Sequence, residues 1–171
     1  MCCVGYLQVE DANDAPVLAD KTCYMAEDTE ENSDICTFSA SDQDSTANDW
    51  GKHEYSLVSA IYHGDVDEDV TSYFDVPFAN NLGTLTLIED ISLGVDVYKF
   101  AVGKTIDVEV VVTDRGGLND TAIISVVITE TNRPPKCNAG QVFFVEENSL
   151  TGTFVGTVNA TDTNGDAFDA E

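Results

Sequence analysis

Acidic and amide side chains at short, regular spacing are the residues of this sequence best suited to do chemistry. They stand in three places: just before Pro16, in an Asp-x-Asp pair, and at the end of a long alternating apolar segment. In order these residues are Asp11, Asn13, Asp14, Asp42, Asp44 and Asp114. Calcium takes about six to eight oxygen ligands from carboxylates, amides and backbone carbonyls. Cation binding is therefore the chemistry that such acidic and amide side chains could do.

The overall charge agrees with a cation partner. The 171 residues contain 32 Asp and Glu against 7 Lys and Arg, for a formal net charge of -25. Such an excess attracts cations and strains the compact state in their absence. Nucleic acid and an anionic membrane surface are disfavoured as partners, because both are bound through Lys and Arg. The length allows one full domain plus fragments of others, with a real core.

The elements that must position these side chains are β-strands. Residues 106–112 alternate apolar and polar, and residues 122–130 form a β-branched run, so both predict core strands. Shorter strands are expected at 24–27, 35–40, 54–58, 84–88 and 141–146. Gly- and Asn-rich turns separate them, and helical periodicity is lacking. We predict an all-β, Greek-key sandwich.

An internal repeat adds to this interpretation. Ile35, Thr37 and Ala40 match Val155, Thr157 and Ala160 at one constant offset. The segments that begin at Asp11 and at Glu130 match at an offset one residue shorter. One full repeat with pieces of two neighbours is therefore expected.

These residues resemble motifs of the cadherin family. Asp11 to Pro16 resembles the DxNDxxP linker between cadherin extracellular repeats, and Asp42 with Asp44 resembles the DxD motif. Asp114 ends a segment that resembles the motif of the sixth strand, and Glu147 with Asn148 resembles the xEN motif. The resemblance implies a seven-stranded, cadherin-like β-sandwich repeat. It divides the chain into 1–15 (the last strand of a preceding repeat plus a calcium linker), 16–130 (a complete repeat) and 131–171 (a linker and the first strands of a following repeat).

The resemblance also assigns calcium ligands. At the first linker they would be Asp11, Asn13, Asp14, Asp42, Asp44 and Asp114. At the second linker they would be Glu27, Glu130, Asn132, Asp162 and Asn164. The second linker departs from the pattern, because Arg133 replaces an aspartate and the family's DRE triplet aligns with Lys99, Phe100 and Ala101. We expect little or no calcium there.

Catalysis is not expected. His53 and His63 match no catalytic motif and are expected to be exposed loop residues. The acidic run from Asp65 to Asp69 is expected to be a solvated loop rather than a catalytic pair. Trp50 is expected to be partly buried.

The cysteines and two sequons fit an extracellular chain. Cys23 and Cys36 can pair across the sandwich, but two buried thiols, or pairing of Cys23 outside the repeat, remain alternatives. With five cysteines, one at least would need a partner elsewhere in an oxidising compartment. Asn119 and Asn159 begin N-glycosylation sequons.

Family resemblance implies calcium-dependent cell–cell adhesion by a rigid ectodomain segment on the extracellular face of the plasma membrane. Its partners would be other cadherin ectodomains, homophilic or heterophilic. A signal peptide and a membrane span are not evident, so the chain is expected to be a piece of a longer protein. A secreted acidic calcium-binding matrix protein, or an accessory module of a larger extracellular enzyme, remains an alternative.

Overall fold

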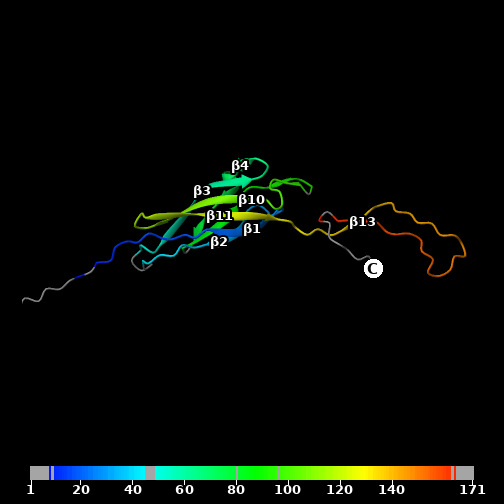
Figure 1. The fold of residues 1–171 in the computed structure, drawn as a ribbon, viewed down its shortest axis with the longest axis horizontal. Helices are drawn as coiled ribbons and strands as arrows, with labels where there is room; N and C mark the ends of the chain where they lie inside the picture. The colour runs from blue at the N-terminus through cyan, green and yellow to red at the C-terminus, as the bar shows by residue number, and fades with distance from the viewer. Residues whose placement is uncertain are drawn as a thin grey trace, which may run out of the picture. The chain divides into compact units, whose positions relative to one another are not determined.

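The computed structural model describes residues 8, 10–44, 49–79, 81–95, 97–162 and 164. The chain separates into two compact units, Met1–Thr129 and Glu130–Glu171 (Figure 1). Each unit is described by itself below. No helix within the described ranges is long and apolar enough to cross a membrane.

Five strands of the first unit form one sheet in the order β1-β11-β10-β3-β4. Their bounds are β1 (Lys21–Ala26), β3 (His53–His63), β4 (Asp67–Asp69), β10 (Thr105–Asp114) and β11 (Asn119–Thr129). β1 runs parallel to β11, and the other pairs are antiparallel. Every second residue of β10 is buried, as the sequence alternation predicts. Ile106, Val108, Val110 and Val112 are all 0% exposed.

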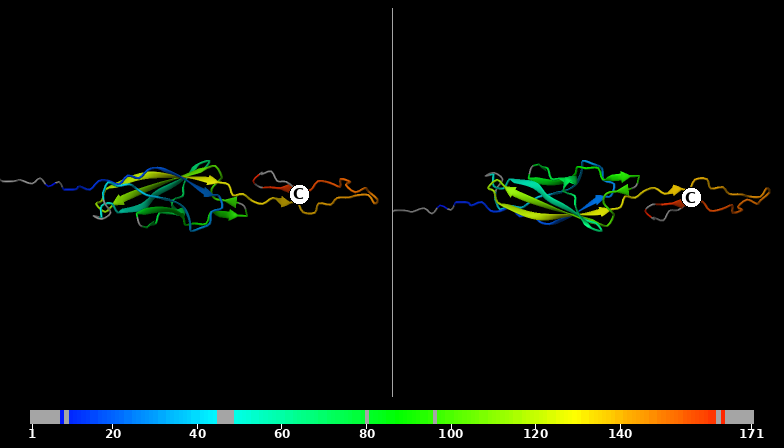
Figure 2. Two further views of the ribbon diagram at one scale, coloured as in Figure 1. Left: turned by 90° about the horizontal axis from the view of Figure 1, so that it is seen from below. Right: turned by 90° about the horizontal axis from the view of Figure 1, so that it is seen from above.

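The second sheet has the order β2-β7-β5, with β6 also paired to β7. Its strands are β2 (Ser33–Phe38), β5 (Phe74–Asp75), β6 (Phe78–Ala79) and β7 (Leu82–Leu87). A short 3-10 turn, η2 (Thr71–Tyr73), precedes β5, and a separate hairpin joins β8 (Ser92–Gly94) to β9 (Val97–Tyr98). Figure 2 shows the two sheets as two layers. One continuous core takes side chains from both sheets. The predicted all-β sandwich is therefore confirmed.

Phe100 lies at the centre of an aromatic cluster in this core. Its side chain is 1% exposed, and its ring centroid lies 5.2 Å from that of Tyr62, 5.7 Å from Tyr73 and 6.2 Å from Phe74. The neighbouring Lys99 pairs with Glu68, with 2.5 Å between Nζ and Oε1. Lys99, Phe100 and Ala101 are the residues where the family's carboxylates are missing. Phe100 packs in the core instead, where a buried charged group would be costly.

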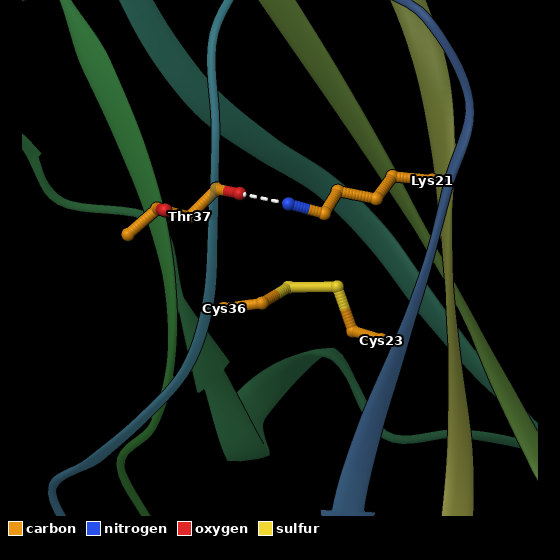
Figure 3. The surroundings of a disulfide bond; sticks show 4 residues. All are labelled: Lys21, Cys23, Cys36 and Thr37. Atoms are coloured by element: carbon orange, nitrogen blue, oxygen red, sulfur yellow. Dashed lines mark hydrogen bonds between the residues drawn. A yellow bond between two sulfur atoms is a disulfide. The ribbon is translucent and has the colours of Figure 1, made fainter.

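A disulfide joins the two sheets. Cys23 of β1 and Cys36 of β2 are bonded, with 6.2 Å between their Cα atoms. Beside this bond, Lys21 Nζ donates a hydrogen bond to the backbone carbonyl of Thr37, which gives a second cross-connection between the same strands (Figure 3). The pairing that the sequence left open is thus present. Cys137 is a free, exposed thiol in the second unit.

The second unit contains little regular structure. Lys136–Cys137 (β12) pairs antiparallel with Ala160–Thr161 (β13). The strand predicted at 141–146 is wrong, since the structure has none there. In the first unit β1 is held by pairing to β11. The described part of 130–164 contains no counterpart of β11, so the backbone of 141–146 has no strand to pair with.

Three sequence predictions of exposed loops need correction. His53 begins β3 and is buried, at 5% exposure. His63 ends the same strand with its side chain 38% exposed, so it is not a loop residue either. The middle of the acidic run, Asp67–Asp69, forms the edge strand β4, although all three residues are exposed. Trp50 is partly buried, as expected.

Candidate functional site

The first candidate ligands meet where the linker passes the end of β10. Asp114 is the last residue of β10 and is only 4% exposed. Its Oδ2 accepts a hydrogen bond from Asn13 Nδ2 at 2.8 Å, and its Oδ1 accepts one from the Leu118 backbone N–H at 2.9 Å. The fold thus joins residues that are 101 positions apart in the sequence.

The ionised form of Asp114 is favoured by these donors. Burial opposes ionisation and would raise the pKa of the Asp114 carboxyl. Hydrogen bonds from the Asn13 amide and from the backbone N–H groups of Leu118, Gly117 and Gly116 outweigh that effect and hold the pKa below its ordinary value of 3.8. A carboxylate that stays charged while buried is well suited to binding a cation.

The Asp-x-Asp pair is built on two consecutive backbone hydrogen bonds. Asp44 Oδ2 accepts from the Asp14 backbone N–H at 2.7 Å, which ties the linker to the loop after β2. The Asp44 backbone N–H donates in turn to Asp42 Oδ1 at 2.8 Å. Nearby, Val17 and Ser41 form an antiparallel bridge. The structure therefore ties the linker to Asp44 and Ser41, and Asp44 in turn to Asp42.

A buried histidine completes the surroundings of Asp42. His53 Nε2 lies 2.9 Å from Asp42 Oδ2, and the two side chains are 4% and 3% exposed. In the β3–β10 register His53 is directly opposite Asp114. Sequence reasoning missed His53 because the predicted strand began one residue later; its alternation with buried Tyr55 was the available signal.

The oxygen atoms around Asn13 have the chemistry that a calcium ion requires. Asn13 Oδ1 is buried and has no hydrogen-bond partner among the residues that the structure describes. A buried polar atom is costly unless a donor or an ion satisfies it. The donor set here consists of carboxylate, amide and backbone oxygens, which suit a hard cation such as Ca²⁺. The residues fit calcium in chemistry, although no three His, Cys, Asp or Glu side chains in the described ranges already converge as a metal cluster.

Gly116 makes room for the Asn13 amide. A Cβ atom at position 116 would lie 2.4 Å from Asn13 Nδ2 and 2.7 Å from Asn13 Oδ1, which is closer than real contacts. Only glycine permits this approach without displacing Asn13.

The remaining predicted residues of the first unit lie at its surface or outside this cluster. Asp11 is exposed, and Asp14 contributes its backbone rather than a described side-chain contact. Glu27 follows β1, where its backbone N–H donates to the Thr129 carbonyl at 2.9 Å. Asn119 is the exposed first residue of β11.

The second unit repeats the backbone pattern of the first linker. The Arg133 N–H donates to Asn164 Oδ1 at 2.7 Å, and the Asn164 N–H donates to Asp162 Oδ1 at 2.9 Å. The pairing of Lys136 with Thr161 corresponds to the bridge between Val17 and Ser41. Three contacts of the first linker thus recur in the second unit at the offsets of the sequence repeat.

The chemistry at the second linker differs, however. Asn164 Nδ2 donates to Glu130 Oε1 at 2.7 Å and to the Thr131 carbonyl at 3.0 Å. Asn164 therefore points a donor N–H at these oxygen atoms, where the matching residue of the first linker, Asp44, has a carboxylate oxygen. Asn132 is exposed. The sequon residue Asn159 is exposed as well, and its backbone N–H donates to Gln141 Oε1 at 2.6 Å.

Comparison of the sequence finds no matching family model and no matching curated protein. Comparison of the structure finds cadherin ectodomains. The human desmocollin-1 ectodomain matches 90% of this chain with a TM-score of 0.55 and 20% identity. The chain contains a cadherin-like repeat. Human CDH23 EC21-23 matches 87% of the chain (TM-score 0.52, 22% identity), and protocadherin gamma B2 extracellular cadherin domains 1-5 match 91% (TM-score 0.52, 24% identity).

The chain spans 27% of the desmocollin-1 ectodomain, 47% of the CDH23 fragment and 27% of the protocadherin gamma B2 fragment. At these identities the likeness concerns the fold. Asn13, Asp42, Asp44 and Asp114 lie where the segment before β1 meets the end of β10 and the loop after β2.

Proposed function

We propose that the first linker binds calcium through Asn13, Asp42, Asp44 and Asp114, and that Asp11 and Asp14 contribute when a preceding repeat is present. The unpartnered, buried Asn13 Oδ1 beside the ionised Asp114 is the observation that carries the proposal. Bound calcium would supply positive charge to acids that otherwise repel one another. Asn13 and Asp14 then hold the linker against the sandwich through their contacts to Asp114 and Asp44.

From calcium binding we infer an adhesion function. The chain would be a stiffened segment of an ectodomain on the extracellular face of the plasma membrane, with other cadherin ectodomains as partners. The cadherin fold and the disulfide support an extracellular role. The exposed sequon residues Asn119 and Asn159 would carry glycans. We propose no enzymatic role for this chain.

Calcium should raise the thermal stability of the chain. If the dissociation constant is about 10⁻⁴ to 10⁻³ M, as in extracellular modules, 10 mM Ca²⁺ should stabilise the fold by about 1.4 to 2.7 kcal/mol through mass action. Thermal unfolding followed by circular dichroism at constant ionic strength, with CaCl₂ or with EDTA, measures this. Magnesium is the control, since it demands a tighter octahedral site and should stabilise much less. Equal stability in calcium and in EDTA would refute the proposal.

We further propose that hydrogen bonds within the second unit, and not calcium, stabilise the second linker. Asn164 already donates to the oxygen atoms of Glu130 and Thr131, and Arg133 brings a positive charge where the matching residue of the first linker, Asp14, is acidic. A guanidinium repels a divalent cation. The two linkers would therefore respond differently to chelation.

Exchanging these residues should create a calcium site. The double variant Arg133→Asp, Asn164→Asp copies the acids of the first linker, so its calcium content at equilibrium dialysis should rise by about one ion per chain over wild type. Thr151→Asp, which adds an acid at an exposed position of the same unit, is the control and should leave the content unchanged. A double variant with the wild-type calcium content would contradict the proposal.

A further inference from the structure

His53 stands out among the buried polar groups of the first unit. Its side chain is 4% exposed and that of Asp42 is 3% exposed, so water does not separate Nε2 from Oδ2 at 2.9 Å. The backbone of His53 is fixed as well, because its N–H donates to Asn81 Oδ1 at 3.1 Å while Asn81 Nδ2 donates to the Gly51 carbonyl at 2.7 Å. The Tyr55 ring lies edge-on to the imidazole at 6.5 Å.

The hydrogen bonds determine which ring nitrogen carries the proton. An ionised carboxylate only accepts hydrogen bonds, so Nε2 must donate to Asp42 Oδ2. Nδ1 is buried without a hydrogen-bond partner in the described residues. A proton on Nδ1 would be a buried, unsatisfied donor, which is more costly than a bare acceptor nitrogen. In a neutral imidazole the proton therefore lies on Nε2.

This donor completes the support of the Asp42 carboxylate. Oδ1 accepts from the Asp44 backbone N–H at 2.8 Å, and Oδ2 accepts from His53. With both oxygens held, the carboxylate cannot rotate freely. Each oxygen has a second lone pair, so both remain able to bind a cation. Ligating carboxylates in metal sites are commonly held by such outer partners.

We propose that His53 is a positioning residue for calcium binding: it orients Asp42 from within the sandwich and does not bind the ion itself. The inference rests on the proposed function of the first linker. His53 also links two ligands, because it contacts Asp42 and lies opposite Asp114 in the β3–β10 register. The first residue of β3 thus contacts one proposed ligand, Asp42, and pairs with the residue of β10 that is the other, Asp114.

Two variants of the full chain separate a positioning role from simple core filling. His53→Gln keeps a neutral N–H donor near the position of Nε2, whereas His53→Phe keeps an aromatic ring and loses the donor. Calorimetric titration should show calcium affinity about 10- to 100-fold weaker for His53→Phe and within about threefold of wild type for His53→Gln. His63→Phe, at the far end of β3, is the control and should bind as wild type does.

A second readout uses wild-type protein without calcium. The ¹⁵N shifts of the His53 ring should report a protonated Nε2, the donor that the role requires. Wild-type affinity in His53→Phe, or an Nε2 without a proton, would overturn the role of His53 while leaving calcium binding intact. A failure of wild-type protein to bind calcium would instead overturn the proposed function, and the positioning role with it.

Discussion

Replacing Cys23 and Cys36 by alanine should lower the free energy of unfolding by about 3 kcal/mol. The disulfide closes a loop of 13 positions. A crosslink over such a loop lowers the conformational entropy of the unfolded chain, which stabilises the folded state by about 3 kcal/mol. It also joins β1 of one sheet to β2 of the other, so its loss leaves the Lys21–Thr37 hydrogen bond as the neighbouring cross-connection. Urea unfolding of the double variant under oxidising conditions measures the change.

Cys137→Ser is the matched control, because Cys137 is exposed and unbonded. A surface substitution of this kind should change stability by less than about 0.5 kcal/mol. A double variant as stable as Cys137→Ser would show that the disulfide contributes nothing to the fold.

Replacing Asp114 by alanine should damage both stability and calcium binding. The Asn13 amide and the Leu118 N–H would lose their acceptor, and an unsatisfied buried group costs about 1 to 3 kcal/mol. We expect a total loss of about 3 kcal/mol by chemical unfolding in EDTA, and no calcium-dependent stabilisation. Asp114→Asn keeps the shape and one acceptor oxygen, so it should lose less stability and still lose calcium binding. An alanine variant that calcium stabilises as it does wild type would contradict this role.

Asp114 should also make the free energy of unfolding depend on pH. The folded state lowers the pKa of Asp114 below 3.8, so its ionised carboxylate adds stability that is complete above the unfolded pKa. That contribution is lost as the pH falls through the lower folded pKa. Acid unfolding of Asp114→Asn in EDTA should therefore depend less steeply on pH in this range than acid unfolding of wild type.

The core strands could be predicted from the sequence because their side chains alternate between core and solvent. Residues 106–112 and 122–130 lie within β10 and β11, whose buried residues form one face. The hairpin of β8 and β9 was not predicted, since Leu93 and Val95 are 65% and 90% exposed and contradict a rule that places apolar residues inside. The strand expected at 141–146 failed because strand pairing depends on a distant partner, not on local pattern.

The candidate site was predicted in part. The resemblance to cadherin motifs named Asn13, Asp42, Asp44 and Asp114. The structure places them in two contacting pairs, Asn13 with Asp114 and Asp42 with Asp44. The role of His53 could not be predicted, because its contact with Asp42 depends on how β3 packs against the loop after β2. Gly116 was likewise missed, since its importance lies in the space it leaves for Asn13.

Calorimetric titration of calcium into the wild-type chain and into Asp44→Asn tests the central claim most directly. Asn at position 44 retains an oxygen for the Asp14 N–H but removes the charge, and so copies Asn164 of the second linker. Glu54→Gln, which removes an exposed carboxylate of β3, is the control. We predict that wild type and Glu54→Gln bind at least one calcium ion and that Asp44→Asn binds none at the first linker. Equal calcium binding by all three proteins would contradict the assignment of this site.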